Sequence, residues 1–446
     1  TINAAGGNAP APRKGEDAPV KVLVVGGGGR EHALIRKLAE SPLIDRLYCA
    51  PGNGGIEAEA TCVPLRATEV EALADWAAAN AMDYVVIGPD DPLCLGLSDL
   101  LLQRGIPAFG PSKAAARIEG SKVYAKKLMR KYGIPTASCE IFSDLELALR
   151  YLRIAPYPVV VKADGLALGK GVTVCQDREQ AEEAVRDCME RGRFGASGAR
   201  VVVEECLTGP EVSVLALTDG ITLRALPSGM DHKRALDGDQ GQNTGGMGVI
   251  APNPYYTPAI AEECMRTIFL PTLAALRAEG TPFQGCLYFG LMLTPDGPRV
   301  IEYNCRFGDP EAQAMLPLLQ SDLFAIFRHI TAGTLDQADV RIAPGASCCV
   351  VLASGGYPAA YAVDRPIDGL AAAEALPGVS VFHAGTRRAP DGRLLTAGGR
   401  VLGVTAVADT LPEAVARAYA AADGITFEGA SLRRDIGVRA MAAPRG

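Results

Sequence analysis

Three side chains that could bind a metal ion and a phosphate lie at alternate positions near residue 300. The segment VIEYNCRFGDPE, residues 300–311, contains Glu302, Asn304 and Arg306 at every second position. Side chains at alternate positions of a β-strand point to the same face of the sheet. Two oxygen ligands beside a guanidinium suit Mg²⁺ next to a phosphoryl group, since Mg²⁺ prefers oxygen ligands and Arg neutralises phosphate charge. An exposed ion pair between Glu302 and Arg306 is the alternative interpretation.

A second group of residues could hold a triphosphate. In VVVKADGLALGKGV, residues 159–172, Lys162 lies on a predicted strand that leads into a glycine-rich loop containing Lys170. The spacing differs from a Walker A loop, but mobile backbone amides and ammonium groups can still cover phosphates. The next predicted strand ends in acidic residues and is followed by Glu211, which suits backbone recognition of adenine and a carboxylate on the ribose hydroxyls. A solvated hairpin is the alternative interpretation of residues 159–172.

Glycine-rich loops near the N-terminus could bind an anion. Gly26 to Gly29, in VVGGGGREHAL, allow a tight turn before a predicted helix, where backbone N–H groups favour a phosphate. The loops PGNGG, residues 51–55, and GPDDP, residues 88–92, follow successive predicted strands, so we expect them at one edge of a parallel sheet. The spacing does not match the GxGxxG dinucleotide pattern, which favours a phosphorylated small molecule. Close packing of strand and helix is the alternative role of the glycines.

These residues need an α/β scaffold to position them. Apolar runs such as KVLVV, residues 21–25, alternate with helical patterns, which predicts a doubly wound parallel sheet. A cationic helix before Pro135 marks the end of this first domain. The segment from about 135 to 208 suggests a small unit of sheet and helices that closes over a ligand. The polar, glycine-rich segment 230–248 is long enough to be a functional loop.

Composition excludes several classes of protein. A length of 446 residues predicts about three domains, and a hydrophobic content of 48% is enough for each to have a core. The net charge of −7 and the absence of a basic run argue against nucleic acid as a partner. No apolar run is long enough to span a membrane and residues 1–20 lack a signal-peptide core, so we expect a cytoplasmic protein. Twelve Cys without a CxxC pattern and only four His argue against a zinc site or a disulfide framework.

The motifs occur in an order that resembles one enzyme family. GGREHAL, PGNGG, IEGSK, KADGLALGKGV, DHKR, NTGGMG and EYNCRFGDPE together resemble the glycinamide ribonucleotide synthetases, phosphoribosylamine–glycine ligases of purine biosynthesis with an ATP-grasp fold. The resemblance implies that ATP, glycine and 5-phosphoribosylamine yield glycinamide ribonucleotide, ADP and phosphate, with Mg²⁺ or Mn²⁺, in a monomer.

The resemblance also implies an α/β architecture with several parts. These are an N-terminal doubly wound parallel-sheet domain, an ATP-grasp core with a small lid subdomain, and a C-terminal α/β domain. The expected spans are 1–20 for a flexible leader, 21–121 for the phosphoribosylamine-binding domain, 122–345 for the ATP-grasp domain with its lid at about 135–208, and 346–446 for the C-terminal domain.

Roles for single residues follow from the same resemblance. The catalytic residues would be Arg306, Asp309, Lys162 and Asp231, and the metal ligands Glu302 and Asn304. ATP would contact Lys122, Lys162, Gly165, Gly169, Lys170, Gly171, Glu204, Glu205, Cys206, Leu207 and Glu211. The other substrates would contact Gly28, Gly29, Arg30, Asn53, Gly88, Asp90, Lys233, Asn243, Thr244, Gly245 and Gly246. Leu168, Asp90, Gln242 and Phe289 differ from residues frequent in the family, so we expect the enzyme class to hold but not every detail of the pocket.

We expect the chemistry to pass through an acyl phosphate. The glycine carboxylate would attack the γ-phosphoryl group to give glycyl phosphate, which the amine of phosphoribosylamine would then attack. Because no side chain serves as the nucleophile, catalysis would rest on positioning, charge neutralisation and exclusion of water. Two other functions are considered, namely a related ATP-grasp ligase with a different amine or acid and a non-catalytic nucleotide sensor. The presence of both Glu302 and Asn304 argues against the sensor.

Overall fold

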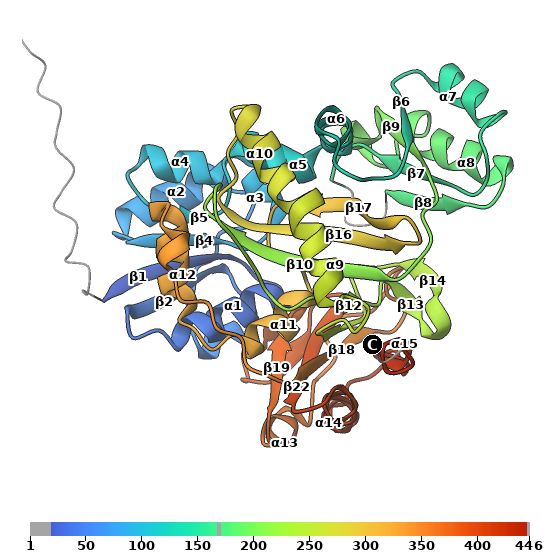
Figure 1. Cartoon of the computed structure of the whole chain (residues 1–446). Coiled ribbons are helices and arrows are strands. Elements are labelled where there is room, and N and C mark those ends of the chain that lie inside the picture. The colour runs from blue at the N-terminus through green and yellow to red at the C-terminus, as the bar shows by residue number, and fades with distance from the viewer. Residues whose placement is uncertain (1–18, 167–170, 444–446) are drawn as a thin grey trace, which may run out of the picture.

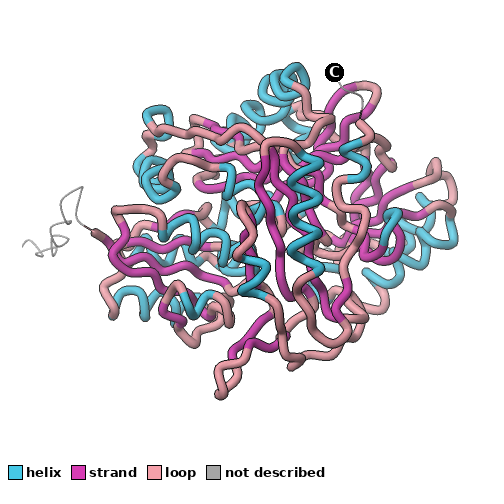
Figure 2. Tube along the Cα trace, turned by 90° about the horizontal axis from the view of Figure 1, so that it is seen from below, coloured by secondary structure: helices cyan, strands magenta, loops and turns pink. Residues whose placement is uncertain are grey.

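The computed structural model describes residues 19–166 and 171–443. An N-terminal, a central, a C-terminal and a lid sheet form the frame of the described chain (Figure 1). The strands run through the molecule with helices packed over them (Figure 2). The fold is α/β with a parallel N-terminal sheet, as predicted. Among the described residues, no helix is long and apolar enough to cross a membrane.

The N-terminal sheet is parallel and has helices on both faces. Its strand order is β3-β2-β1-β4-β5, and β1 pairs in parallel with both β2 and β4. Val22 and Val24 pack with α1, whereas Leu23 and Val25 pack in the cluster that contains α2 and α4. Burial on both faces explains why this strand is apolar throughout. The elements are β1 (Val20–Gly26), α1 (Gly29–Ala39), β2 (Ile44–Pro51), β3 (Thr61–Cys62), α2 (Val70–Ala79), β4 (Tyr84–Ile87), α3 (Asp90–Leu95), α4 (Leu97–Gln103), β5 (Ala108–Phe109) and α5 (Lys113–Gly120).

The lid projects from the body of the molecule (Figure 1). Its antiparallel sheet has the order β6-β9-β7-β8, and residues of α7 and α8 complete a small separate core. Asp144 and Asp177 cap these two helices by accepting backbone N–H groups of the first turn. The elements are α6 (Lys122–Tyr132), β6 (Cys139–Phe142), α7 (Leu145–Leu152), β7 (Val159–Ala163), β8 (Val172–Cys175), α8 (Arg178–Met189) and β9 (Val201–Glu205).

The central sheet is antiparallel and has the order β11-β10-β16-β17. Val212 and Val214 of β10 pack in a cluster with α10, whereas Leu215 and Leu217 pack with α12. Each cluster also contains residues of the N-terminal sheet, so the two sheets share continuous cores. The elements are β10 (Glu211–Thr218), β11 (Leu223–Ala225), α9 (Pro258–Cys264), α10 (Leu270–Ala278), β16 (Gly285–Thr294), β17 (Gly297–Asn304), α11 (Glu311–Met315) and α12 (Leu323–Ala332).

The C-terminal sheet takes strands from two separate parts of the chain. Its order is β12-β15-β18-β22-β19, and β23 also pairs with β18. The segment 230–248, predicted to be a loop, instead contains β12 and the hairpin β13–β14 and reaches β15. These strands are two to four residues long and mostly polar, so no alternating pattern reveals them. The elements are β12 (Met230–Asp231), β13 (Arg234–Leu236), β14 (Gln240–Asn243), β15 (Gly248–Ala251), β18 (Ala346–Ser354), α13 (Leu370–Glu374), β19 (Val379–His383), β20 (Thr386–Arg388), β21 (Leu394–Thr396), β22 (Arg400–Ala408), α14 (Leu411–Asp423), β23 (Ala430–Ser431) and α15 (Val438–Met441).

Candidate active site

Glu302 and Asn304 lie on one face of β17. Between and after them, Tyr303 and Cys305 are buried in the core on the opposite side. Arg306 was predicted to continue this alternation on the strand, but the strand ends at Asn304. The Arg306 guanidinium nevertheless donates to Asn304 Oδ1 at 3.4 Å, so the three side chains stay together.

Lysine side chains surround the Glu302 carboxylate. Lys233 Nζ lies 3.4 Å from Glu302 Oε1 and 3.2 Å from Glu211 Oε2. Lys233, opposed by burial and joined by Lys162 and Lys122, lowers the pKa of Glu302 to about 2. Glu302 is therefore ionised at neutral pH although it lies in a partly buried site.

The oxygen atoms of Glu302 and Asn304 fit a hard divalent cation. Mg²⁺ commonly binds one or two protein oxygens and takes its other ligands from substrate phosphates and water. Within the described ranges, no three His, Cys, Asp or Glu side chains gather as a metal-binding group. The site thus suits a cation that arrives with a phosphate rather than one held in a closed protein cage.

Lys122 and Lys162 bring two further ammonium groups to this region. Lys122 opens α6, and its Nζ donates to Gly165 O at 3.1 Å. Lys162 lies on β7, and its Nζ donates to Ile301 O of β17 at 3.1 Å. Burial lowers the pKa of Lys122, although the nearby Glu302 opposes this effect.

The structure describes only the two ends of the glycine-rich loop after β7. At one end, Gly165 accepts the hydrogen bond from Lys122. At the other, Gly171 O accepts the Ala163 backbone N–H at 2.8 Å. The predicted ATP contacts Gly169 and Lys170 lie outside the described residues.

Asp164 connects the end of β7 to the start of α6. Its Oδ1 accepts hydrogen bonds from Ser121 Oγ and from the Val123 backbone N–H, both at 2.8 Å, and Arg200 pairs with its other oxygen. These bonds fix the first turn of the helix that carries Lys122. Sequence reasoning missed Asp164, although an acidic residue directly after a strand in KADG was the available signal.

The Glu204 carboxylate at the end of β9 is buried in ion pairs. Its Oε2 lies 3.0 Å from Lys162 Nζ and 3.2 Å from Lys126 Nζ, while its Oε1 is closed off from solvent without a hydrogen-bond partner. Glu205 ends β9, Cys206 and Leu207 follow it, and Glu211 then opens β10. These predicted ATP contacts thus follow the same strand end.

The glycine turn after β1 already holds a carboxylate. Glu31 Oε2 accepts the Gly28 backbone N–H at 2.6 Å, and Glu31 Oε1 lies 2.5 Å from Arg30 Nε. A Cβ at Gly88 would fall 2.2 Å from Glu31 Oε1, so the side chain occupies space that only glycine leaves. The start of α1 is therefore capped from within the chain, which the prediction of a phosphate at this turn did not include.

Asn53 shapes the PGNGG loop. Its Nδ2 donates to Gly27 O at 3.0 Å and to His383 O at 2.8 Å, and its Oδ1 accepts the Gly55 and Ile56 backbone N–H groups at 2.9 and 3.0 Å. The amide is engaged on both sides by the backbone. Asn53 thus joins the glycine turn of the N-terminal domain to the C-terminal domain.

Asp309 meets groups from two other domains. Its Oδ1 accepts from Gln313 Nε2 at 2.7 Å, and its Oδ2 accepts from the Arg30 backbone N–H at 3.4 Å. Arg400, at the start of β22, donates to Asp309 O at 2.6 Å. A Cβ at Gly29 would fall 2.4 Å from Gln313 Nε2, so the glycine turn and Gln313 are in close contact. Sequence reasoning missed Gln313 and Arg400.

The segment from Asn243 to Gly246 is held from both ends. The Thr244 backbone N–H and Oγ1 both donate to Lys233 O, at 2.8 and 2.9 Å. Arg400 Nη1 donates to Gly245 O at 2.9 Å and to Gly246 O at 3.3 Å. One arginine of the C-terminal domain therefore fixes this segment and Asp309 together.

Asp231 lies under this segment. Gly246 has φ of +113°, and a Cβ there would fall 2.7 Å from Asp231 Oδ1, so the close approach requires glycine. Asp231 Oδ1 has no hydrogen-bond partner and no contact with solvent. Burial, strengthened by the nearby Glu311, raises the pKa of Asp231 well above its ordinary value.

Arg306 is held between two carboxyl groups of the N-terminal domain. Its Nη2 lies 2.9 Å from Glu119 Oε1 and 3.8 Å from Asp90 Oδ2. Burial raises the pKa of Glu119 to about 7 against the effect of Arg306. For Asp90 burial acts in the same direction, but the guanidiniums of Arg306 and Arg30 hold its pKa below the ordinary value. Sequence reasoning missed Glu119, although it belongs to the IEGSK motif.

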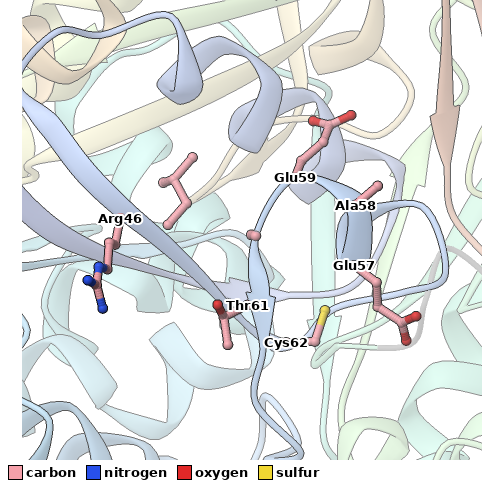
Figure 3. Close-up of a pocket in the computed structure, with 8 residues that line it drawn as sticks. Arg46, Glu57, Ala58, Glu59, Thr61 and Cys62 are labelled. Atoms are coloured by element: carbon pink, nitrogen blue, oxygen red, sulfur yellow. The ribbon is translucent and has the colours of Figure 1, made fainter.

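Two surface pockets are lined by residues other than the predicted site residues, and the second reaches Ser121 beside Lys122. One of about 400 Å³ is lined by Arg46, Thr61, Cys62 and the turn from Glu57 to Glu59 (Figure 3). Another of about 690 Å³ lies beside Cys94 and Lys113. Neither lining contains a predicted site residue, so the candidate site is recognised by its converging charges.

Three family models match nearly the whole chain in order. They are the N domain of phosphoribosylglycinamide synthetase at residues 20–119, its ATP-grasp domain at 120–312 and its C domain at 347–439. The chain belongs to the phosphoribosylglycinamide synthetase family. The phosphoribosylamine–glycine ligase of Agrobacterium fabrum is 50% identical to this chain, and the match covers 95% of this chain and 99% of the relative. The phosphoribosylamine–glycine ligase of Nostoc is 47% identical, and that match covers 94% of this chain and 99% of the relative.

Solved structures agree with this family. The phosphoribosylamine–glycine ligase of Thermotoga maritima matches with a TM-score of 0.82 and 35% identity, covering 94% of this chain and 100% of that chain. A biotin carboxylase from Campylobacter jejuni has a TM-score of 0.72 with 14% identity and covers 95% of each chain. This second likeness concerns the fold, which the synthetase family shares with a different kind of enzyme.

Proposed function

We propose that this chain is a phosphoribosylamine–glycine ligase of purine biosynthesis, which joins glycine to 5-phosphoribosylamine as ATP becomes ADP and phosphate. Family membership supports the choice of substrates. The observation that carries the ATP chemistry is that lysines from three separate segments, Lys122, Lys162 and Lys233, all stabilise the ionised form of Glu302. Ammonium groups concentrated beside oxygen ligands suit a polyphosphate that binds with a divalent cation.

The nucleotide would bind between the lid and the central sheet. Glu302 and Asn304 would hold Mg²⁺ or Mn²⁺, which when bound neutralises phosphate charge. Lys122 and Lys162 would contact phosphate oxygens, and residues 165–171, including Gly165, Gly169, Lys170 and Gly171, would cover them. The strand end from Glu204 to Leu207 would contact adenine, and the Glu211 carboxylate would accept hydrogen bonds from the ribose hydroxyls.

Two displacements complete the reaction. A glycine carboxylate oxygen attacks the γ-phosphorus, the bond to the bridging oxygen of ADP breaks, and glycyl phosphate forms. The amine nitrogen of phosphoribosylamine then attacks the carbonyl carbon, phosphate leaves, and the nitrogen loses a proton. Arg306 and Lys162 offset the charge on the transferring group, and Asp309 and Asp231 line the place where glycine reacts. Closure of the lid excludes water, which would hydrolyse the acyl phosphate.

The other substrates would bind where the three domains meet. We assign phosphoribosylamine to residues 21–121, through Gly28, Gly29, Arg30, Gly88 and Asp90, with Asn53 shaping the loop. Glycine would bind near Lys233 and the segment from Asn243 to Gly246. In this assignment residues 122–345 form the ATP-grasp domain, with its lid at about 135–208, and residues 346–446 close the site in a monomer.

ADP release tests the proposal. The reaction contains ATP, Mg²⁺, glycine and freshly generated phosphoribosylamine, each omitted in turn, and alanine or serine replaces glycine in parallel. Release that requires both glycine and phosphoribosylamine is expected. Release with a different acid or amine would indicate a related ligase, and no release under any condition would contradict a catalytic function.

A further inference from the structure

Three buried charged side chains form a cluster at the proposed nucleotide site, and Lys126 is the one without an assigned role. Lys126 and Lys162 are each 4% exposed, and Glu204 is 3% exposed. Both ammonium groups contact the same oxygen, Glu204 Oε2, at 3.2 and 3.0 Å. Two ammonium groups thus share one carboxylate within this cluster, and Lys162 also faces the ionised Glu302, so the charge of Lys162 is divided between the cluster and the proposed phosphate site.

Lys126 has its donors engaged within the chain. Besides pairing with Glu204, its Nζ donates to Thr136 Oγ1 at 2.8 Å and to Ala137 O at 3.3 Å. An ammonium group has three N–H donors, and these three partners account for them. Thr136 Oγ1 donates in turn to Val300 O at 2.6 Å, so Lys126 is anchored to the central sheet as well as to the lid. Lys126 is therefore placed to hold Glu204 and not to reach a ligand.

Lys162 is placed differently. It pairs with Glu204 and donates to Ile301 O at 3.1 Å, so among the bonds in the described part of the chain one of its three donors remains. Lys122 lies one helical turn before Lys126 on the same face of α6, a helix that contacts both β9 and β17 (Figure 1). Lys122 and Lys126 thus have different partners, because Lys122 donates to Gly165 O and Lys126 pairs with Glu204.

We propose that Lys126 is a positioning residue for ATP: it shares the charge of Glu204, so that the Lys162 ammonium stays available to a nucleotide phosphate. This inference rests on the nucleotide site of the proposed function. Without Lys126, Glu204 would pair with Lys162 only, and the pair would present no net charge to a phosphate. Lys126 would then act on ATP through Glu204 and Lys162 and never touch it.

The first measurement is the ATP dissociation constant by titration calorimetry of the whole chain with Mg²⁺. Lys126→Met is expected to weaken ATP binding roughly ten- to a hundredfold. In turnover the KM for ATP should rise while the KM for glycine stays within about twofold. The matched control is Lys127→Met, which makes the same change at an exposed neighbour on α6 and should leave ATP binding unchanged.

A double variant separates charge sharing from simple packing. In Lys126→Met/Glu204→Gln the carboxylate charge is removed together with its second partner, so Lys162 no longer has a carboxylate that pairs with it alone. ATP binding by this variant should be tighter than by Lys126→Met, whereas a packing role would make the two losses add. Lys126→Arg keeps the charge and should bind ATP better than Lys126→Met. Lys126→Gln replaces Lys126→Met in the comparison should the latter fail to fold.

The outcomes distinguish this inference from the proposed function. No ATP binding by the unaltered chain would overturn the nucleotide site itself and this inference with it. Normal ATP binding by the unaltered chain and by Lys126→Met would overturn the positioning role only. Equal losses in Lys126→Met and Lys126→Arg, or additive losses in the double variant, would do the same, because charge would then not be the cause.

Discussion

The nucleotide side of the candidate site and the loop side where phosphoribosylamine is proposed to bind are held together by different interactions. On the nucleotide side, the ammonium groups of Lys126 and Lys162 share the single carboxylate of Glu204, and Lys122, Lys162 and Lys233 all stabilise the ionised form of Glu302. On the loop side, side chains from the same or another domain satisfy the backbone groups of the glycine turns, as Glu31 accepts the Gly28 N–H and Arg400 donates to Gly245 O. The nucleotide side is therefore organised for an incoming anion, whereas the loop side is organised by contacts between domains.

The largest expected effect tests the nucleotide side. Glu302→Ala should lower ADP release roughly a thousandfold, because it removes the ionised carboxylate that we propose binds the metal beside the transferring phosphate. The control is Asp296→Ala, an acidic residue with an 82% exposed side chain in the turn of the same hairpin. Near-normal turnover by the Glu302 variant would refute the assignment of this carboxylate to the metal.

A smaller effect should fall on the loop side only. Arg400→Met removes the donor that holds Asp309, Gly245 and Gly246 together, so the substrates would be misplaced relative to each other. We expect kcat/KM for phosphoribosylamine to fall about a hundredfold while the KM for ATP stays near normal. Arg393→Met, at a side chain that is 64% exposed, is the control. An equal loss of kcat/KM for phosphoribosylamine and for ATP would show that Arg400 does not act on the loop side alone.

The glycine turn offers a test of stability. Glu31→Ala removes the acceptor of the Gly28 backbone N–H and the partner of buried Arg30. The free energy of unfolding should fall by about 1–3 kcal/mol, measured by chemical denaturation. Glu40→Ala, at the exposed end of the same helix, should change it by less than about 0.5 kcal/mol. An unchanged free energy for the Glu31 variant would mean that water replaces the carboxylate at this turn.

The smallest expected effect is a pH dependence at the junction of the N-terminal and C-terminal domains. The His383 backbone N–H donates to His32 Nδ1 at 2.7 Å, and burial lowers the pKa of both imidazoles, that of His383 to about 3. Depressed pKa values mean that the folded chain keeps these rings neutral while the unfolded chain takes up protons. Stability that is fully present above pH 6.5 should therefore decline as the pH falls toward 3, with about 1.4 kcal/mol lost at pH 5.5 through His383 and a further loss in the same direction through His32.

Thermal unfolding at pH 7.0 and 5.5 measures this decline. His383→Gln removes one of the titrating rings and should show a smaller loss of melting temperature between the two pH values. The His329→Gln variant, at a ring in α12 whose Nδ1 bonds to Thr334 and to neither histidine of the junction, should behave like the unaltered chain. Identical losses in all three proteins would assign the acid sensitivity to other groups.

The strand positions of the nucleotide side could be predicted from the sequence, because their residues lie in motifs with the alternation of a β-strand. Lys162 and Glu302 stand on strands whose opposite faces are apolar, so the period of two places them. Lys126 escaped this reasoning because a lysine on a cationic helix is usually exposed. Its burial follows from Glu204, which lies 78 residues farther along the chain and approaches only when the lid is folded.

The loop side could be predicted only in outline. The parallel sheet places the turns near Gly28, Asn53 and Gly88 at one edge, as expected from the strands that precede them. Glu31 was named within a motif, but its role as a cap depends on the backbone geometry of the turn. Gln313 and Arg400 have no local pattern, because their function follows from contacts with Asp309 across domain boundaries.

The mixed origin of the C-terminal sheet has a consequence for how the chain is made. β18, its central strand, pairs with β15 from far upstream as well as with β22 downstream. During synthesis on the ribosome, the edge of β15 that pairs with β18 therefore has no partner strand until nearly a hundred further residues have emerged. A gene segment encoding only residues 346–446 would lack that partner strand, so this region is not a module that recombination could transplant intact.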